Sequence, residues 1–79
     1  MEIMQCRMAR SGLGWSLNDL AAHSGVSRRT IARFELGGRV SAETLETLRK
    51  TLETAGAEFL RSNRSIGVVL KEKANSAAK

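Results

Sequence analysis

The most informative segment of the sequence is LNDLAAHSGVSRRTIARFEL, residues 17–36. It contains two short stretches with helical apolar spacing, joined by a turn at residues 24–26. Gly25 supplies the backbone freedom that a sharp turn needs, and Ala21 is small where two helices must approach closely. Four apolar side chains are placed to fill the angle between the two helices: Leu20, Val26, Ile31 and Phe34. This pattern predicts a helix-turn-helix unit.

Serine residues mark the expected starts of three helices. Ser16 is followed three residues later by Asp19, which makes an acidic variant of the capping box. Ser27 is the N-cap candidate of the next helix, and Ser41 of the one after that. Because serine oxygens accept the first free backbone N–H groups of a helix, these positions predict where the helices begin.

The flanking sequence extends this unit at both ends. Residues 2–11 are good helix formers, and apolar positions from Leu45 to Ala55 predict a further helix after Ser41. Beyond Gly56 the spacing changes, and residues 57–60 and 66–71 predict a small β-hairpin around a turn-like segment. We therefore expect a mainly α fold of four helices with a C-terminal β-hairpin.

Composition and charge limit the function. The chain has 79 residues, 42% of them hydrophobic, which suits one small domain. Thirteen basic residues, nine of them arginine, against eight acidic ones give a net charge of +5, which favours an anionic partner. One cysteine and one histidine exclude a disulfide framework and a zinc site made of these residues alone. We see neither a membrane-spanning apolar run nor a signal peptide, and expect a cytoplasmic protein.

Three arginines fall in the first part of the third predicted helix: Arg28, Arg29 and Arg33. They lie on the face opposite Ile31 and Phe34. The helix dipole disfavours cations at a helix N-terminus, so an anionic partner would offset the cost of this arrangement. In a helix-turn-helix the N-terminal residues of the second helix enter the major groove, where arginine is the commonest partner of guanine.

We therefore predict a DNA-binding surface. Arg28, Arg29 and Arg33 are expected near base edges, and the hydroxyl groups of Ser27 and Thr30 suit phosphate or base contacts. Arg39 is the expected phosphate contact of the following loop, and Ser16 and Asn18 are weaker phosphate candidates. The sequence leaves open which arginine contacts a base and which a phosphate.

Residues 5–56 resemble the Cro/C1-type (XRE-type) family of bacterial and phage DNA-binding regulators. The matching segments are Gly14-Trp15-Ser16, Asp19-Leu20-Ala21, Ser24-Gly25-Val26-Ser27 and Ile31-Ala32-Arg33-Phe34-Glu35. The resemblance implies a lambda-repressor-like domain and a partly buried ion pair between Arg10 and Glu35. Two positions depart from the family: Leu17, where glutamine is usual and contacts a phosphate, and Gly12, where a larger apolar residue is common.

The resulting prediction is a sequence-specific, double-stranded DNA-binding transcriptional regulator, a repressor, that works at the nucleoid as a homodimer. Residues 1–56 form the DNA-binding domain, residues 57–71 the hairpin and residues 72–79 a flexible tail. The hairpin either makes the dimer contact or only covers the helical core. The alternative function is an antitoxin-like module that binds a partner protein and autoregulates its operon.

Other functions find little support. The chain has no nucleophile–base set and no paired inward carboxylates, so we do not expect an enzyme. We expect no cofactor, no metal ion and no membrane partner. Three further residues are interpreted as structural: Cys6 as a core thiol, Trp15 as a packing residue between helices, and His23 as a capping or surface residue.

Overall fold

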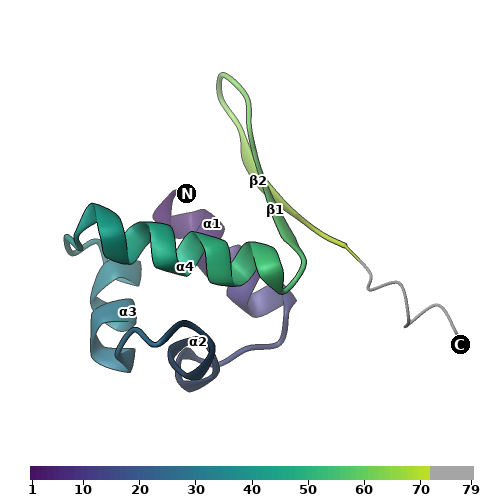
Figure 1. The fold of residues 1–79 in the computed structure, drawn as a ribbon. Coiled ribbons are helices and arrows are strands. Elements are labelled where there is room, and N and C mark those ends of the chain that lie inside the picture. The colour runs from purple at the N-terminus through teal and green to yellow at the C-terminus, as the bar shows by residue number, and fades with distance from the viewer. Residues whose placement is uncertain (72–79) are drawn as a thin grey trace, which may run out of the picture.

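The computed structural model describes residues 1–71 of the chain, and the predicted flexible tail lies outside these residues. The described residues form four helices followed by a two-stranded antiparallel sheet, arranged as in Figure 1. Their bounds are Ile3–Gly12 (α1), Leu17–Ser24 (α2), Arg28–Glu35 (α3), Ala42–Thr54 (α4), Ala57–Arg61 (β1) and Ile66–Leu70 (β2). The prediction of a mainly helical fold with a C-terminal hairpin is confirmed.

The three predicted serine caps are present. Ser16 Oγ accepts the backbone N–H of Asp19 at 3.0 Å, and the Asp19 carboxylate accepts the backbone N–H of Ser16 at 2.8 Å. Ser27 and Ser41 each accept the N–H of the residue three positions later, at 3.1 and 3.0 Å. These bonds satisfy N–H groups that the first turn of a helix leaves free, so the local sequence fixes the starts of α2, α3 and α4.

The turn between α2 and α3 lies one residue later than predicted, at residues 25–27. Ser24 still belongs to α2, and Gly25 ends that helix with a left-handed backbone at φ 79°. The Gly25 N–H donates to the carbonyl of Ala21 at 2.9 Å, and the Val26 N–H donates to Ser24 Oγ at 3.0 Å. The turn is thus held by its own hydrogen bonds in a conformation that glycine adopts at little cost.

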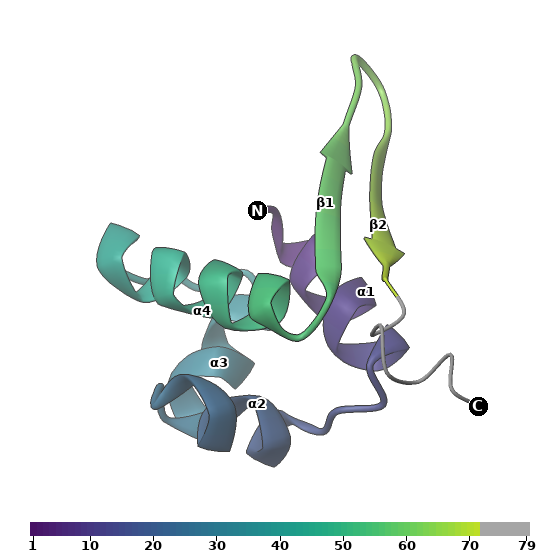
Figure 2. The ribbon, with the colours of Figure 1, turned by 45° about the vertical axis from the view of Figure 1, so that its right-hand side comes forward.

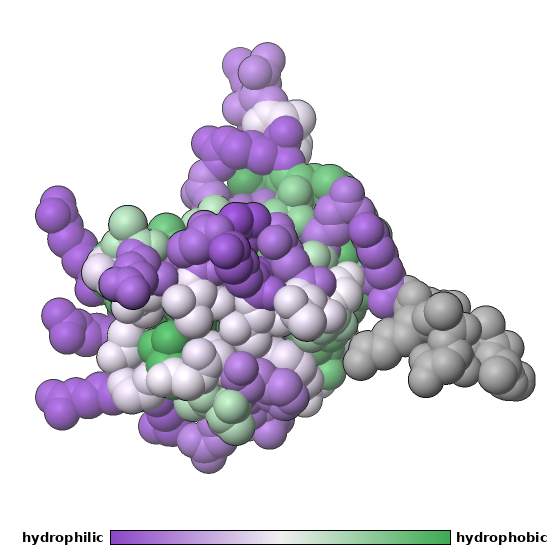
Figure 3. Space-filling model, viewed as in Figure 1, coloured by the Kyte–Doolittle hydropathy of each residue, from purple (hydrophilic) through white to green (hydrophobic). Residues whose placement is uncertain are grey.

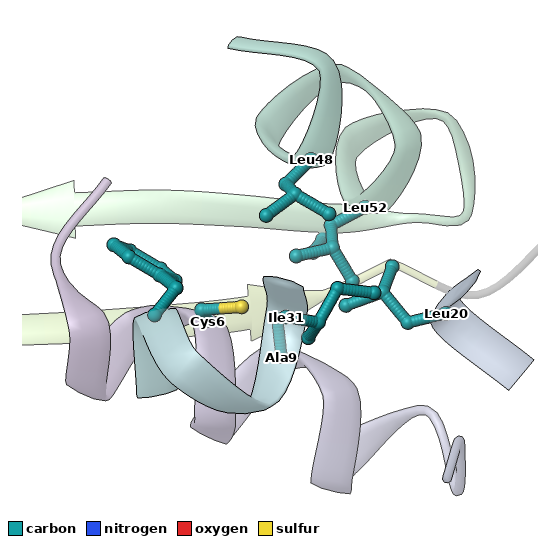
Figure 4. Close-up of a cluster of buried hydrophobic side chains, with 8 residues drawn as sticks. Cys6, Ala9, Leu20, Ile31, Leu48 and Leu52 are labelled. Atoms are coloured by element: carbon teal, nitrogen blue, oxygen red, sulfur yellow. The ribbon is translucent and has the colours of Figure 1, made fainter. Parts of the chain in front are cut away.

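A single apolar core joins all four helices to the first strand (Figure 4). Its buried members are Cys6, Ala9, Leu20, Ile31, Phe34, Leu48, Leu52 and Ala57. The two α1 residues in this set are small, which lets α1 approach α3 and α4 closely. Each fully buried leucine or isoleucine contributes about 1.5–3 kcal/mol relative to an exposed position. The core therefore fixes the orientation of α3 relative to the other helices.

The hairpin pairs Ala57 with Leu70 and Phe59 with Val68, and it stands away from the helices at its turn (Figures 1 and 2). Strand β2 lies along α1, and β1 adjoins α4. The buried Gln5 amide holds the sheet to α1, because its Nε2 donates to two strand carbonyls at 2.8 and 3.1 Å. A two-stranded sheet is marginal alone in water, so this attachment to the helices supports it.

The hairpin also explains the glycine at position 12. A Cβ atom built on Gly12 would lie 2.6 Å from Cδ1 of Leu70, which is well inside van der Waals contact. Leu70 of β2 thus occupies the space that a larger residue on α1 would need. The departure from the family pattern at Gly12 follows from a contact between residues far apart in the sequence.

Candidate nucleic-acid interface

Helix α3 separates its apolar residues from its cations. Ile31 and Phe34 are in the core, whereas Arg28, Arg29 and Arg33 are exposed. In Figure 3, long hydrophilic side chains extend from the side of the molecule on which Figure 1 shows α3. The core contacts of α3 therefore orient its arginines outward.

These arginines carry positive charge that no acidic residue within the described part of the chain pairs with. Within residues 1–71, ion pairs engage Arg10, Arg49, Arg61 and Lys71. The remaining described cationic side chains are Arg7, Arg28, Arg29, Arg33, Arg39, Lys50 and Arg64. Four of these seven lie on α3 or in the loop that follows it. The free positive charge is concentrated there.

The N-terminus of α3 strengthens this electropositive character. Helices α2 and α4 carry Asp19 and Glu43 in their first turns, but the first turn of α3 holds no acidic residue. The dipole of α3 and its two leading arginines, Arg28 and Arg29, therefore add rather than cancel. An anion is the partner that suits this end of the helix.

The hydroxyl groups predicted at the interface bond to each other. Ser27 Oγ donates to Thr30 Oγ1 at 2.9 Å while it accepts the Thr30 N–H, and Thr30 is half-buried. Ser16 is engaged in its capping box, whereas Asn18 and Arg39 are exposed. The hydrogen bond from the Ser16 backbone N–H lowers the pKa of Asp19, which keeps that carboxylate charged at the start of α2. The exposed arginines are thus better placed for an external partner than the hydroxyl groups.

Arg10 and Glu35 form a bidentate ion pair that joins α1 to α3. Arg10 Nε and Nη2 donate to the two Glu35 carboxylate oxygens at 2.9 and 2.8 Å, and Nη1 donates to the carbonyl of Trp15 at 3.1 Å. The Cys6 thiol donates to Glu35 Oε2 at 3.5 Å. Burial and the neighbouring Glu35 carboxylate raise the pKa of Cys6 to about 12, so this thiol is protonated and unreactive. The network fixes α3 against the rest of the domain.

Comparison with known protein families agrees with this geometry. A model of the helix-turn-helix family matches residues 4–59. The chain belongs to the Cro/C1-type (XRE) helix-turn-helix family. Its members are DNA-binding regulators and are typically not enzymes. A search of curated proteins found no match. No helix among the described residues of this Cro/C1-type protein is both long and apolar enough to cross a membrane.

An aromatic stack braces α2 in the Cro/C1-type domain. The rings of Trp15 and His23 lie 4.1 Å apart between centroids at an interplanar angle of 14°. His23 Nδ1 also lies 2.8 Å from the Asp19 carbonyl one turn earlier. The sequence predicted that both residues are structural but did not pair them. Trp15 precedes the N-cap of α2 and lies outside the helix, so helical periodicity does not relate it to His23 and the sequence offered no signal for the stack.

Leu36 is an exposed apolar residue beside the arginines that was not among the residues predicted from the sequence. It directly follows α3, and its side chain is 88% exposed. It stands four residues after Ala32 and seven after Arg29, so helical periodicity places it on the arginine face. At position 17, where glutamine is usual in the family, this chain has Leu17, which packs partly against the core. The arginine face of α3 in this Cro/C1-type domain therefore continues into one exposed apolar side chain, Leu36.

Proposed function

We propose that this chain is a sequence-specific, double-stranded DNA-binding transcriptional regulator, a repressor, that acts at the nucleoid in the cytoplasm. The observation that carries the proposal is the exposed arginine face of α3, formed by Arg28, Arg29 and Arg33, none of which has an ion-pair partner within residues 1–71. A duplex provides guanine acceptors and phosphates for all three. Family membership supports the same DNA-binding role.

Recognition divides between base and phosphate contacts. With α3 lying along the major groove, its forked guanidinium groups suit guanine O6 and N7. Arg39 in the loop after α3 suits a phosphate, and so does the exposed Asn18 amide at the start of α2. The Arg10–Glu35 pair acts indirectly by holding α3 at a fixed angle.

Loss of an arginine that contacts a base should change DNA binding differently from loss of an arginine that contacts a phosphate. Duplexes selected from a random pool by the full-length protein provide the probe. Arg29→Ala and Arg33→Ala should each weaken binding to the selected duplex by about 1–3 kcal/mol and relax the base preference. Arg39→Ala should weaken binding to all duplexes similarly and reduce the salt slope by about 1. Arg64→Ala, which removes an unpaired arginine from the hairpin turn, is the matched control.

The measurement is binding affinity across a panel of duplexes and several salt concentrations. Equal losses for Arg29→Ala, Arg33→Ala and Arg64→Ala, with unchanged base preference, would contradict base recognition by α3. Failure of the wild-type protein to select any duplex at near-physiological ionic strength would reject the function itself.

We also propose that the protein works as a homodimer assembled through the hairpin. Leu60 and Val69 are 44% and 43% exposed, and Ala57 and Phe59 of the same sheet face the core. Because side chains alternate along a strand, Leu60 and Val69 point away from the helices. The two strands also present open edges, which favour pairing with another strand. A two-fold dimer would contact half-sites about 10 bp apart.

A charge on the outward face tests the dimer. Val69→Arg should leave the fold intact, since the side chain faces solvent in the isolated chain, and should convert dimers to monomers in sedimentation. Arg64→Ala is again the control. Substitution is preferable to truncation at Gly56, because truncation would remove Ala57 from the core and Leu70 from Gly12. A dimer unaffected by Val69→Arg would place the dimer contact elsewhere, and a wild-type protein that binds DNA as a monomer would reject the homodimer.

A further inference from the structure

An apolar patch lies within the arginine surface of α3. We call it the α3 apolar patch, and its members are Leu17, Ala32 and Leu36. They line a shallow depression of about 210 Å³ together with Arg7, Arg10 and Glu35. Leu17 and Ala32 are half-buried, whereas Leu36 stands out into solvent. The patch therefore has an apolar base and one prominent leucine.

The patch occupies the middle of the outward face of α3. Successive residues of a helix are 100° apart, so Ala32 and Leu36 point between the direction of Arg28 and that of Arg29 and Arg33. Arg29 and Leu36 are seven residues apart, which is about 10.5 Å along the helix axis. That length corresponds to about three base-pair steps of 3.4 Å. If α3 lies along the major groove, one duplex can therefore contact the arginines and the patch together.

The arginines around the α3 apolar patch limit which kind of partner can bind it. An apolar protein surface pressed against Leu36 would also desolvate Arg29 and Arg33, which have no ion-pair partner within residues 1–71. A duplex supplies acceptors for those guanidinium groups. It also presents one apolar group in the major groove, the methyl group on C5 of thymine, which 5-methylcytosine shares.

We propose that the α3 apolar patch, with Leu36 as its main contact, recognises a pyrimidine 5-methyl group, and that Leu36 is a specificity-determining residue. This inference rests on the proposed DNA-binding function. It assigns part of the base preference to an apolar contact in addition to the arginines. The binding site should accordingly contain a thymine next to the bases that the arginines contact. It should lie on the side nearer the C-terminus of α3.

The test replaces thymine by uracil, one position at a time, in a duplex selected by the wild-type protein. Uracil lacks only the 5-methyl group, and burial of one methyl is worth about 0.8 kcal/mol. One position should therefore bind the wild type about fourfold more weakly when it carries uracil. Leu36→Ala should lose most of that discrimination. Met4→Ala, which truncates an exposed apolar residue of α1, should keep it.

Two further measurements keep the outcomes separate. A cytosine placed at the sensitive position, with and without a 5-methyl group, shows whether the methyl alone or the thymine base is recognised. Thermal unfolding of Leu36→Ala should match the wild type, because the side chain is exposed. Equal effects of uracil on wild type and Leu36→Ala at every position would overturn the inference. So would a uniform loss of Leu36→Ala affinity on all duplexes, which indicates a sugar contact. Failure to select any duplex rejects the proposed function instead.

Discussion

Removal of Arg10 should destabilise the domain far more than its partly exposed position suggests. The side chain of Glu35 is 8% exposed, and both of its carboxylate oxygens accept hydrogen bonds from Arg10. Arg10→Ala leaves this carboxylate buried with only the weak thiol donor of Cys6. Loss of one partner from a buried ion pair costs about 3–5 kcal/mol. A domain of this size has a total stability of about 4–12 kcal/mol, so the variant should be marginally folded.

Denaturant unfolding, followed by circular dichroism and by the fluorescence of Trp15, measures this loss. Arg61→Ala is the matched control, because Arg61 pairs with Glu2 through side chains that are 63% and 47% exposed. Exposed pairs contribute about 0–1 kcal/mol, so Arg61→Ala should shift the midpoint only slightly.

A double variant separates the cost of the unpaired charge from the value of the pair. Arg10→Met combined with Glu35→Leu removes both charges and should be more stable than Arg10→Ala alone. The reasoning is refuted if Arg10→Ala loses less than about 1 kcal/mol, or if the double variant is the less stable of the two.

Three more predictions follow from the caps and from the hairpin. Ser41→Ala should lower the free energy of unfolding by about 1 kcal/mol without changing DNA affinity, as measured by urea unfolding and duplex titration. The pKa of Asp19 is lowered in the folded state by the backbone of Ser16, so its stabilisation is present above the unfolded pKa and is lost as pH falls through the folded one. Wild type should therefore be more stable than Asp19→Asn at neutral pH, and thermal unfolding should show this difference shrinking below about pH 4. Gly12→Ala should displace Leu70 and gain less than the usual ~0.5–1 kcal/mol of a helical glycine-to-alanine change, whereas the same change in a Leu70→Ala background should gain it fully.

The helical part of the fold could be predicted because its signals are local. Ser16, Ser27 and Ser41 bond to groups three residues away, so a cap is readable without knowledge of the tertiary structure. The Gly25 turn shifted by one residue because hydrogen bonds from Gly25 and Val26 keep Ser24 within α2. The start of the first helix was less clear, since its N-cap is Glu2, whose backbone N–H donates to Gln5 Oε1, rather than a serine.

The contacts that escaped prediction join distant parts of the chain. Gln5 reaches strand carbonyls of Leu60 and Gly67, and Gly12 makes room for Leu70, which no local pattern reveals.

On α3, helical periodicity was enough to predict that the arginines are exposed. Leu36 was overlooked because it stands one residue beyond the helix end, although its phase continues that of α3. The hydroxyl groups of Ser27 and Thr30 proved to be engaged with each other, a pairing that residue type alone does not show.

The position of Cys6 gives the protein a built-in reporter of its own opening. It is the single cysteine of the chain, it is fully buried, and its pKa of about 12 keeps the thiolate scarce in the folded state. An alkylating reagent can then modify the protein only when α1 separates from α3. The rate of labelling therefore follows the population of opened molecules, and a duplex that binds only the folded form should slow labelling as the bound fraction rises.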